Sequence, residues 1–322
     1  MKSNFEKSEF EYDCKLLAEL VKKGANYREY QNPLRRVKNN TKYGEKEKKK
    51  LFIEYLFGKV PKSEVEISYE EIINTYKFLK EINDGTEIKC NDKFFSHGSG
   101  KLKEIYNLLS NYGIESCKIL NRIDIGCSKE KMEEIIEYLN KRNIDSKKVI
   151  EKFPQIFNYS LENINEKISF LKENDIDTIK VVEKCPSIIG LKIETLEEKI
   201  KYLEEIGCRL KNVIELNPNF LGQNKKTIEE KIKNLEKHGF NIKKLINSYP
   251  AILNYKIESL NEKIKYLEKN GYSIEEIENF PACLGRSLEC IEKRIKYLKG
   301  KGKHLPLARI FRSSDEYFYE KY

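Results

Sequence analysis

The chain has 322 residues, of which 35% are charged and 39% hydrophobic, and its formal net charge is +9. These proportions are typical of a water-soluble protein rich in surface helices, and no apolar run approaches the roughly 18 residues that a membrane-spanning helix needs. With only three histidines, and eight cysteines that form no C-x-x-C pair, we expect no metal site, no cofactor and no enzymatic activity.

The first hundred residues are less regular than the rest, and residues 1–100 are expected to form a mostly helical region of unclear role. Residues 12–23 have an amphipathic helical pattern, and an apolar helix is expected near residues 51–57. A further helix begins at Ser68, whose position three residues before a glutamate is typical of a capping box. Residues 83–101 are expected to be a loop or a small hairpin.

This first region is also basic. Residues 1–60 hold 15 Lys and Arg against 9 Asp and Glu. The polar segment 31–50 contains Arg35 and Arg36, and arginine forks match the geometry of phosphate oxygens. These two arginines are therefore candidates for contacts with nucleic acid.

From about residue 101 the chain becomes a repeat. Pro154, Pro186, Pro218 and Pro250 are each 32 residues apart, and Pro281 follows after 31. Each proline opens the same pattern of a short apolar run, a long helix, a break and a second short helix. Two degenerate copies precede the regular ones. A fixed period of this length predicts a solenoid in which each helix pair buries its apolar face against its neighbours.

The long helix of each repeat carries its own start, stripe and stop signals. The start is expected at a small or polar residue followed three positions later by a glutamate, namely at Asn163, Thr195, Thr227 and Ser259. The stripe is exemplified by Ile164, Ile168 and Leu171, which are spaced i, i+4 and i+7. The stop is a glycine four residues past the last stripe leucine, where left-handed backbone ends a helix: Gly207, Gly239, Gly271 and Gly302.

The consensus of the repeats is P-x-(I/F)-(I/L), followed by (S/T)-(L/I)-E and then by K-I-x-(Y/F)-L-x-x-x-G. This pattern resembles the repeat of the mitochondrial transcription termination factor (mTERF) family. The ending from Arg294 to Tyr322 is similar to that family's closing segment. The resemblance implies an all-α, curved, right-handed superhelical solenoid of helix pairs of about 32 residues with short 3₁₀ turns. This solenoid and its C-terminal cap are expected to span residues 101–322, and nucleic acid, usually duplex DNA, is expected along a basic groove.

One column of cations recurs immediately before the central isoleucine of each long helix. Its members are Lys167, Lys199, Lys231, Lys263 and Arg294. Stacked repeats would align them into a ladder about 40 Å long, enough for roughly a dozen base-pair steps of nucleic-acid backbone. The alternative is that each side chain covers apolar surface or pairs with a carboxylate of the next repeat.

A second group of cations lies near the C-terminus, where residues 286–312 hold 9 Lys and Arg against 2 Asp and Glu. Besides Arg294, the candidates for phosphate contacts in this group are Arg286, Lys299, Lys301, Lys303, Arg309 and Arg312.

The sequence therefore predicts a binding protein that acts by occupancy in transcription or RNA regulation, with duplex DNA or structured RNA held by backbone contacts. The alternative is a protein-interaction scaffold, an inhibitor or an adaptor that binds a protein or nucleoprotein complex, since helical solenoids also present surfaces suited to proteins. No membrane partner is expected, and a monomer is favoured. The acidic residues near the start of the chain do not fit a signal or transit peptide, so a cytoplasmic location is expected and an organellar one is less favoured.

Overall fold

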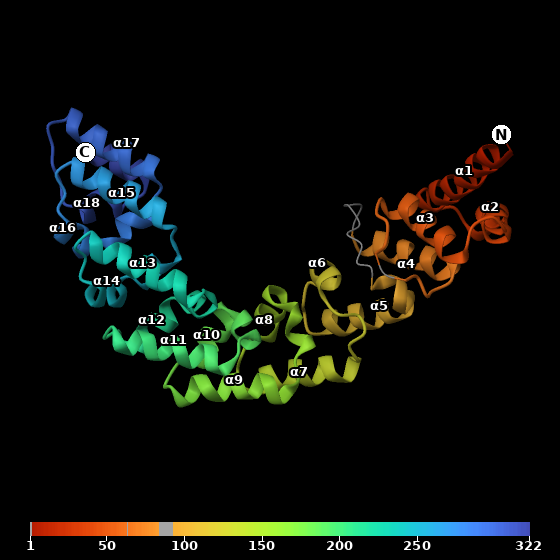
Figure 1. Ribbon diagram of the computed structural model, residues 1–322, viewed down its shortest axis with the longest axis horizontal. Coiled ribbons are helices and arrows are strands. Elements are labelled where there is room, and N and C mark those ends of the chain that lie inside the picture. The colour runs from red at the N-terminus through yellow and green to blue at the C-terminus, as the bar shows by residue number, and fades with distance from the viewer. Residues whose placement is uncertain (1, 63, 84–92) are drawn as a thin grey trace. The chain divides into compact units, whose positions relative to one another are not determined.

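The computed structural model describes residues 2–62, 64–83 and 93–322, and over these residues the chain is all-helical with no strand (Figure 1). Long helices alternate with short ones and with 3₁₀ turns, which confirms the predicted helical-repeat architecture. The chain separates into two compact units, Met1–Leu161 and Glu162–Tyr322. The separate region predicted for residues 1–100 stays a prediction.

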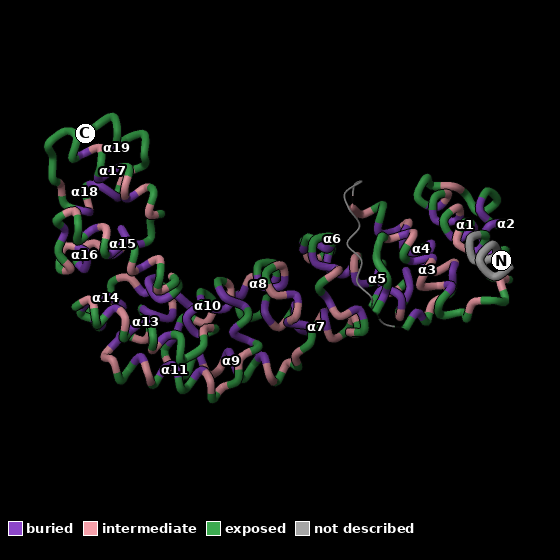
Figure 2. The backbone as a smooth tube through the Cα atoms, turned by 45° about the horizontal axis from the view of Figure 1, so that its top comes forward, coloured by how far each residue is buried: buried purple, intermediate pink, exposed green. Residues whose placement is uncertain are grey.

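The first unit consists of helices and short 3₁₀ turns. Its elements are α1 (Lys2–Lys22), α2 (Tyr27–Asn39), α3 (Glu45–Phe57), α4 (Tyr69–Ile82), α5 (Phe94–Asn111), α6 (Ser116–Ile119), η1 (Leu120–Arg122), α7 (Lys129–Lys141), α8 (Ser146–Lys152) and η2 (Pro154–Asn158). The core formed by α1 to α4 is built from one fully buried stripe per helix. Leu17, Leu34, Phe52 and Ile72 are representative members of these stripes. Figure 2 shows such buried positions in purple where the helices pack together.

One expectation for this region needs correction. The polar segment 31–50 agrees with the mostly helical region that was expected, because most of it belongs to α2 and α3, and α2 buries an apolar face made of Tyr30, Leu34 and Val37. Residues 84–92 of the expected loop lie outside the described residues. From Phe94 onward the segment is helix, interrupted at Gly98, whose φ of +73° suits glycine.

The second unit repeats a long helix, a short helix and a 3₁₀ turn. Its elements are α9 (Leu161–Glu173), α10 (Thr178–Lys184), η3 (Pro186–Gly190), α11 (Ile193–Glu205), α12 (Leu210–Leu216), η4 (Pro218–Gly222), α13 (Lys225–Lys237), α14 (Ile242–Ser248), η5 (Pro250–Asn254), α15 (Ile257–Lys269), α16 (Ile274–Asn279), η6 (Pro281–Gly285), α17 (Leu288–Gly300), α18 (Leu307–Phe311) and α19 (Asp315–Lys321). Each of the five spaced prolines opens a 3₁₀ turn of five residues, where its fixed φ and missing N–H are tolerated.

The stop signals are confirmed, whereas the start signals are wrong. Gly207, Gly239, Gly271 and Gly302 all have φ between +65° and +88°, and Asp175 takes the same place in the preceding repeat with φ +55°. The long helices begin two residues before the predicted caps. In α11 the cap is Lys192, which makes no side-chain bond, and Thr195 lies inside the first turn. The reason is local: only two residues separate the end of each 3₁₀ turn from the next helix, so the backbone is already helical at the predicted cap.

Candidate nucleic-acid interface

The recurring cations of the second unit lie in the interior. Lys199 is 4% exposed, and Lys231 and Lys263 are also buried. Each ammonium donates to a carbonyl of the 3₁₀ turn that follows in the next repeat: Lys199 to Leu221, Lys231 to Leu253 at 2.5 Å and Lys263 to Leu284 at 2.9 Å. Three consecutive repeat junctions are thus closed by the same contact.

Burial also changes the pKa of these three lysines. The pKa values of Lys199, Lys231 and Lys263 are lowered because burial takes the charged ammonium out of water. The carbonyl oxygens offset part of this penalty, because they satisfy donors that would otherwise be buried without partners. These lysines join the long helix of one repeat to the turn of the next.

The two ends of the column differ from its middle. The buried Lys167 pairs with the neighbouring Glu166 at 2.5 Å. Arg294, 2% exposed, donates to Asp315 at 2.9 Å through Nε and to the Ser313 carbonyl at 3.0 Å. Its guanidinium carbon lies 4.7 Å from the centre of the Phe318 ring. Arg294 therefore fastens the closing segment, including α19, onto α17.

The prediction that these five cations line an exposed wall does not fit their burial. Lys167, Lys199, Lys231, Lys263 and Arg294 are all below 9% exposed and bonded within the protein, so they cannot reach phosphates in this conformation. The position flanks the apolar stripe, as the sequence indicated. In the stacked repeats, this side of the long helix faces the neighbouring repeat, whose 3₁₀ turn covers the cation.

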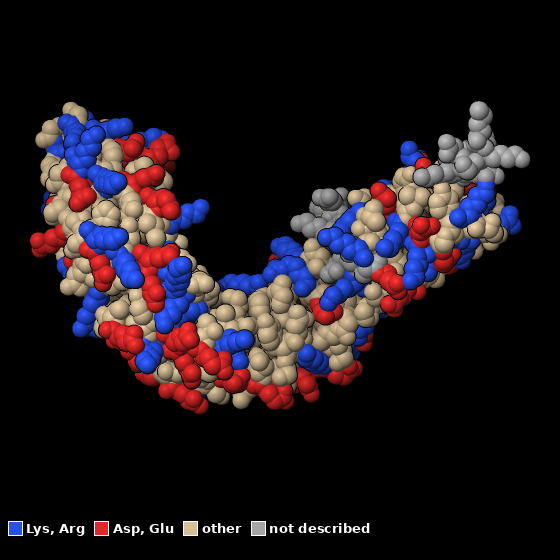
Figure 3. All heavy atoms as spheres, in the orientation of Figure 1, with Lys and Arg blue, Asp and Glu red and all other residues tan. Residues whose placement is uncertain are grey.

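The C-terminal cations behave differently. The six candidates outside the column are all exposed, and among the described residues none has an ion-pair partner: Arg286, Lys299, Lys301, Lys303, Arg309 and Arg312. Nearby lysines of α17 are neutralised, because Lys293 pairs with Glu289 and Lys296 with Glu292. Figure 3 shows blue side chains gathered over α17 and the C-terminal end. We call the six unpaired cations the C-terminal cluster.

Part of this cluster surrounds a hollow of about 370 Å³. Arg286 and Arg312 line it together with Tyr249, Phe280 and Phe311. Arg286 donates to the Phe311 carbonyl at 2.9 Å, and the Arg312 guanidinium lies 5.7 Å from the centre of the Phe280 ring. These contacts hold both guanidinium groups in place while leaving further donors on each fork for an anionic ligand.

Lys299, Lys301 and Lys303 lie at the other end of α17. Lys301 approaches the Tyr297 ring at 5.3 Å, and Lys303 donates to the Tyr322 carbonyl at 3.3 Å. Because α17 rises about 1.5 Å per residue, its two ends are roughly 20 Å apart. The C-terminal cluster therefore has one group of positive charge near each end of α17.

A further basic hollow was missed by sequence reasoning. It has a volume of about 470 Å³ and is lined by Arg209 and Lys243 with Lys244, Asn247 and neighbouring polar residues of the short helices. Lys244 pairs with Glu278 at 3.4 Å, whereas Arg209 and Lys243 have no ion-pair partner among the described residues. Arg209 lies two residues after Gly207, whereas Lys243 lies four residues after Gly239, so these cations do not recur at one position of the repeat.

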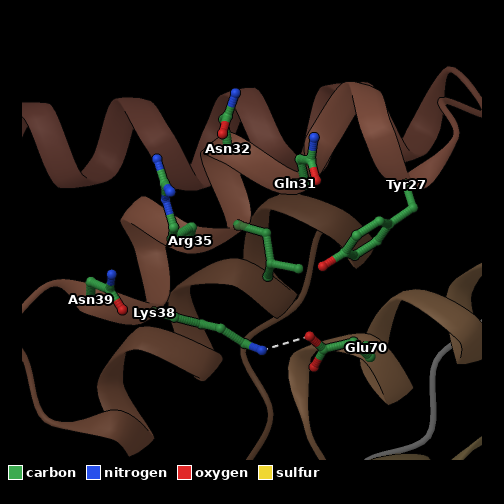
Figure 4. Close-up of a pocket in the computed structure, with 8 residues that line it drawn as sticks. Tyr27, Gln31, Asn32, Arg35, Lys38, Asn39 and Glu70 are labelled. Atoms are coloured by element: carbon green, nitrogen blue, oxygen red, sulfur yellow. Dashed lines mark hydrogen bonds and ion pairs between the residues drawn. The ribbon is translucent and has the colours of Figure 1, made fainter.

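The two N-terminal candidates, Arg35 and Arg36, differ in whether they form an ion pair. Arg36 pairs with Asp13 at 2.8 Å, and the carboxylate raises the pKa of Arg36. Arg35 is exposed beside a hollow of about 250 Å³ between α2 and the start of α4 (Figure 4). Arg36 thus braces α2 against α1, and Arg35 remains accessible.

Other kinds of site find little support in the geometry. Over the described residues, no three His, Cys, Asp or Glu side chains come together as metal ligands would. No described helix is both long enough and apolar enough to cross a bilayer. Buried thiols are inert rather than activated, since burial raises the pKa of Cys283 to about 12 and that of Cys208 to about 11.

Stacked helix pairs with a 3₁₀ turn per repeat and cations left exposed at the C-terminal end define an α-helical repeat protein with a basic surface. The mTERF family model matches residues 44–216 and 177–319, so the chain belongs to the mTERF family. Members of this family are helical-repeat proteins that bind nucleic acid. No curated protein matches the chain.

Proposed function

We propose that the protein binds the backbone of a nucleic acid through the C-terminal cluster and acts by occupancy in transcription or RNA regulation. The observation that carries this proposal is the set of six exposed cations without ion-pair partners, on a chain of a nucleic-acid-binding family. Some surface lysines elsewhere are paired with acids, for example Lys180 with Glu215 and Lys211 with Asp175.

The physical basis is the release of counterions. Each phosphate neutralised by a cation contributes about −0.9 to the slope of log affinity against log salt on duplex DNA. Six contacts give a slope near −5, so affinity would fall by roughly a thousandfold between about 50 and 200 mM salt. A protein-interaction scaffold, the alternative function, predicts no measurable binding to random-sequence duplex at low salt.

The experiment is a salt titration of binding to labelled random-sequence DNA and RNA duplexes, measured by fluorescence anisotropy. The variant Arg286→Ala/Arg312→Ala is expected to bind more weakly and to reduce the salt slope by about 2. The matched control is Lys293→Ala/Lys296→Ala, which removes two cations of α17 that are already paired with glutamates. Absence of binding by the wild-type protein, or equal slopes in all three proteins, would overturn the proposal.

A further inference from the structure

The outward face of α2 is rich in arginine for this chain. Lysine outnumbers arginine 51 to 10 overall, yet three of the ten arginines lie within the thirteen residues of α2. Arg28, Asn32, Arg35 and Asn39 are spaced i, i+4, i+7 and i+11, which places them on one line along a helix. We call these four residues the α2 stripe.

The stripe is exposed and its side chains have no partners within the protein. All four residues are exposed, on the side opposite the buried Tyr30, Leu34 and Val37. Among the described residues, none of the four side chains makes a hydrogen bond or an ion pair. The stripe contains no acid, although acids alternate with lysines on most surface helices of this chain.

The surroundings hold the helix firmly. On one flank Arg36 is fixed by Asp13, and on the other Lys38 pairs with Glu70 at 2.5 Å. In Figure 4, Tyr27 and Lys38 point toward Glu70, the only carboxylate drawn at this hollow. Burial alone would raise the pKa of Glu70, but the hydrogen bond and charge of Lys38, together with further hydrogen bonds to the carboxylate, outweigh it, so this pKa is lowered. The flanking cations Arg36 and Lys38 are thus paired with acids, and Glu29 is an exposed acid of the same helix. The unpaired positive charge of this face therefore comes from Arg28 and Arg35 of the stripe itself.

The donor and acceptor chemistry of the stripe matches the edges of base pairs. Arginine forks donate to the O6 and N7 atoms of guanine, and the asparagine amide both donates to and accepts from adenine. A helix about 10–12 Å wide fits the major groove of B-form DNA, which is about 12 Å wide. The stripe spans about 16 Å, or roughly five base-pair steps. The major groove of duplex RNA is too deep and narrow for such a helix.

We propose that α2 is a recognition helix that reads base edges in the major groove of duplex DNA. This inference rests on the proposed function and adds sequence preference to it, at a place outside the matched family segments, which begin at residue 44. In this division of roles the C-terminal cluster contributes affinity without sequence preference. The α2 stripe supplies the discrimination between sequences.

The experiment starts from a pool of randomised DNA duplexes, from which the full-length protein selects its preferred sequence. The readout is the ratio of dissociation constants for scrambled and selected duplexes. Arg35→Lys keeps the charge and removes the fork, so it is expected to lower this ratio about tenfold while leaving the affinity for scrambled duplex within about twofold. Asn32→Ala is expected to lower the ratio similarly without any change of charge.

The matched control is Arg142→Lys, an equivalent change at an exposed arginine that stacks on Tyr138 in the same unit. It is expected to leave the ratio unchanged. A wild-type protein without sequence preference, a preference for single strands or duplex RNA, or an unchanged ratio in both stripe variants would overturn the inference. Failure of the wild-type protein to bind any nucleic acid would overturn the proposed function as well, so the two failures are distinguishable.

Discussion

Replacing Lys231 by methionine separates the two roles that its position in the sequence allows. The ammonium donates to the Leu253 carbonyl at 2.5 Å and to Gln223 Oε1 at 3.0 Å, and the residue is buried. Methionine keeps an unbranched apolar stem of similar length and removes the donor. If the lysine joins adjacent repeats, Lys231→Met destabilises the protein without affecting nucleic-acid binding.

The expected loss of stability follows from the Leu253 carbonyl, which loses its hydrogen-bond donor in Lys231→Met. A buried carbonyl left without a hydrogen bond costs about 1–3 kcal/mol. Part of this is offset, because burial lowers the pKa of Lys231 and the variant no longer holds a charge away from water. The expected net loss is about 1–2 kcal/mol, which corresponds to a decrease in Tm of roughly 2–8 °C for a unit of this size.

The matched control is Lys233→Met, which removes the same charge from an exposed position of the same helix, α13. Its unfolding free energy is expected to stay within about 0.5 kcal/mol of wild type. Thermal unfolding by circular dichroism measures both variants, and anisotropy measures their binding to duplex. The structural role would be refuted if Lys231→Met bound duplex more weakly at an unchanged Tm while Lys233→Met behaved like wild type. Lys231 would then be a phosphate contact, as the sequence predicted.

Two further predictions follow from buried or strained residues. The pKa of Cys283 is raised from 9.0 to about 12 by burial, so above pH 9 the unfolded chain loses this proton first and stability falls as pH rises. Between pH 9 and 10, the unfolding free energy of wild type should fall by about 1 kcal/mol more than that of Cys283→Ala in urea titrations; parallel pH profiles would contradict this. Asp175 has φ +55°, where four sibling repeats have glycine, so Asp175→Gly is expected to raise the unfolding free energy by up to about 1 kcal/mol. The same change removes the exposed ion pair of Asp175 with Lys211, which contributes little to stability. A lowered Tm would contradict the prediction and show that the aspartate stabilises the fold by more than its backbone strain costs.

Much of the repeat could be predicted because its signals are local. The spaced prolines open 3₁₀ turns, the glycines at positions such as Gly207 adopt left-handed backbone, and the apolar stripes are buried. The helix starts could not be predicted in the same way. The capping pattern at Thr195 is present, but the preceding turn already sets the backbone, so the helix begins earlier.

The candidate site shows where local signals stop being sufficient. The repeat position singled out Lys199 and the local excess of cations singled out Arg286, yet neither signal showed that Lys199 is buried while Arg286 is exposed. Likewise, Arg35 and Arg36 are adjacent in sequence, and only the packing of α1 against α2 shows that Arg36 is taken by Asp13 while Arg35 is accessible.

By itself, the sequence determined the period, the helical class and the family of this protein, because each depends on spacings of a few residues that recur along the chain. The tertiary structure alone decided which cations are structural and which are exposed. A lysine beside an apolar stripe can reach water or a neighbouring carbonyl, and the choice depends on whether the next repeat covers it. At Lys199, Lys231 and Lys263 the following 3₁₀ turn does so, whereas the C-terminal cluster and the α2 stripe stay exposed.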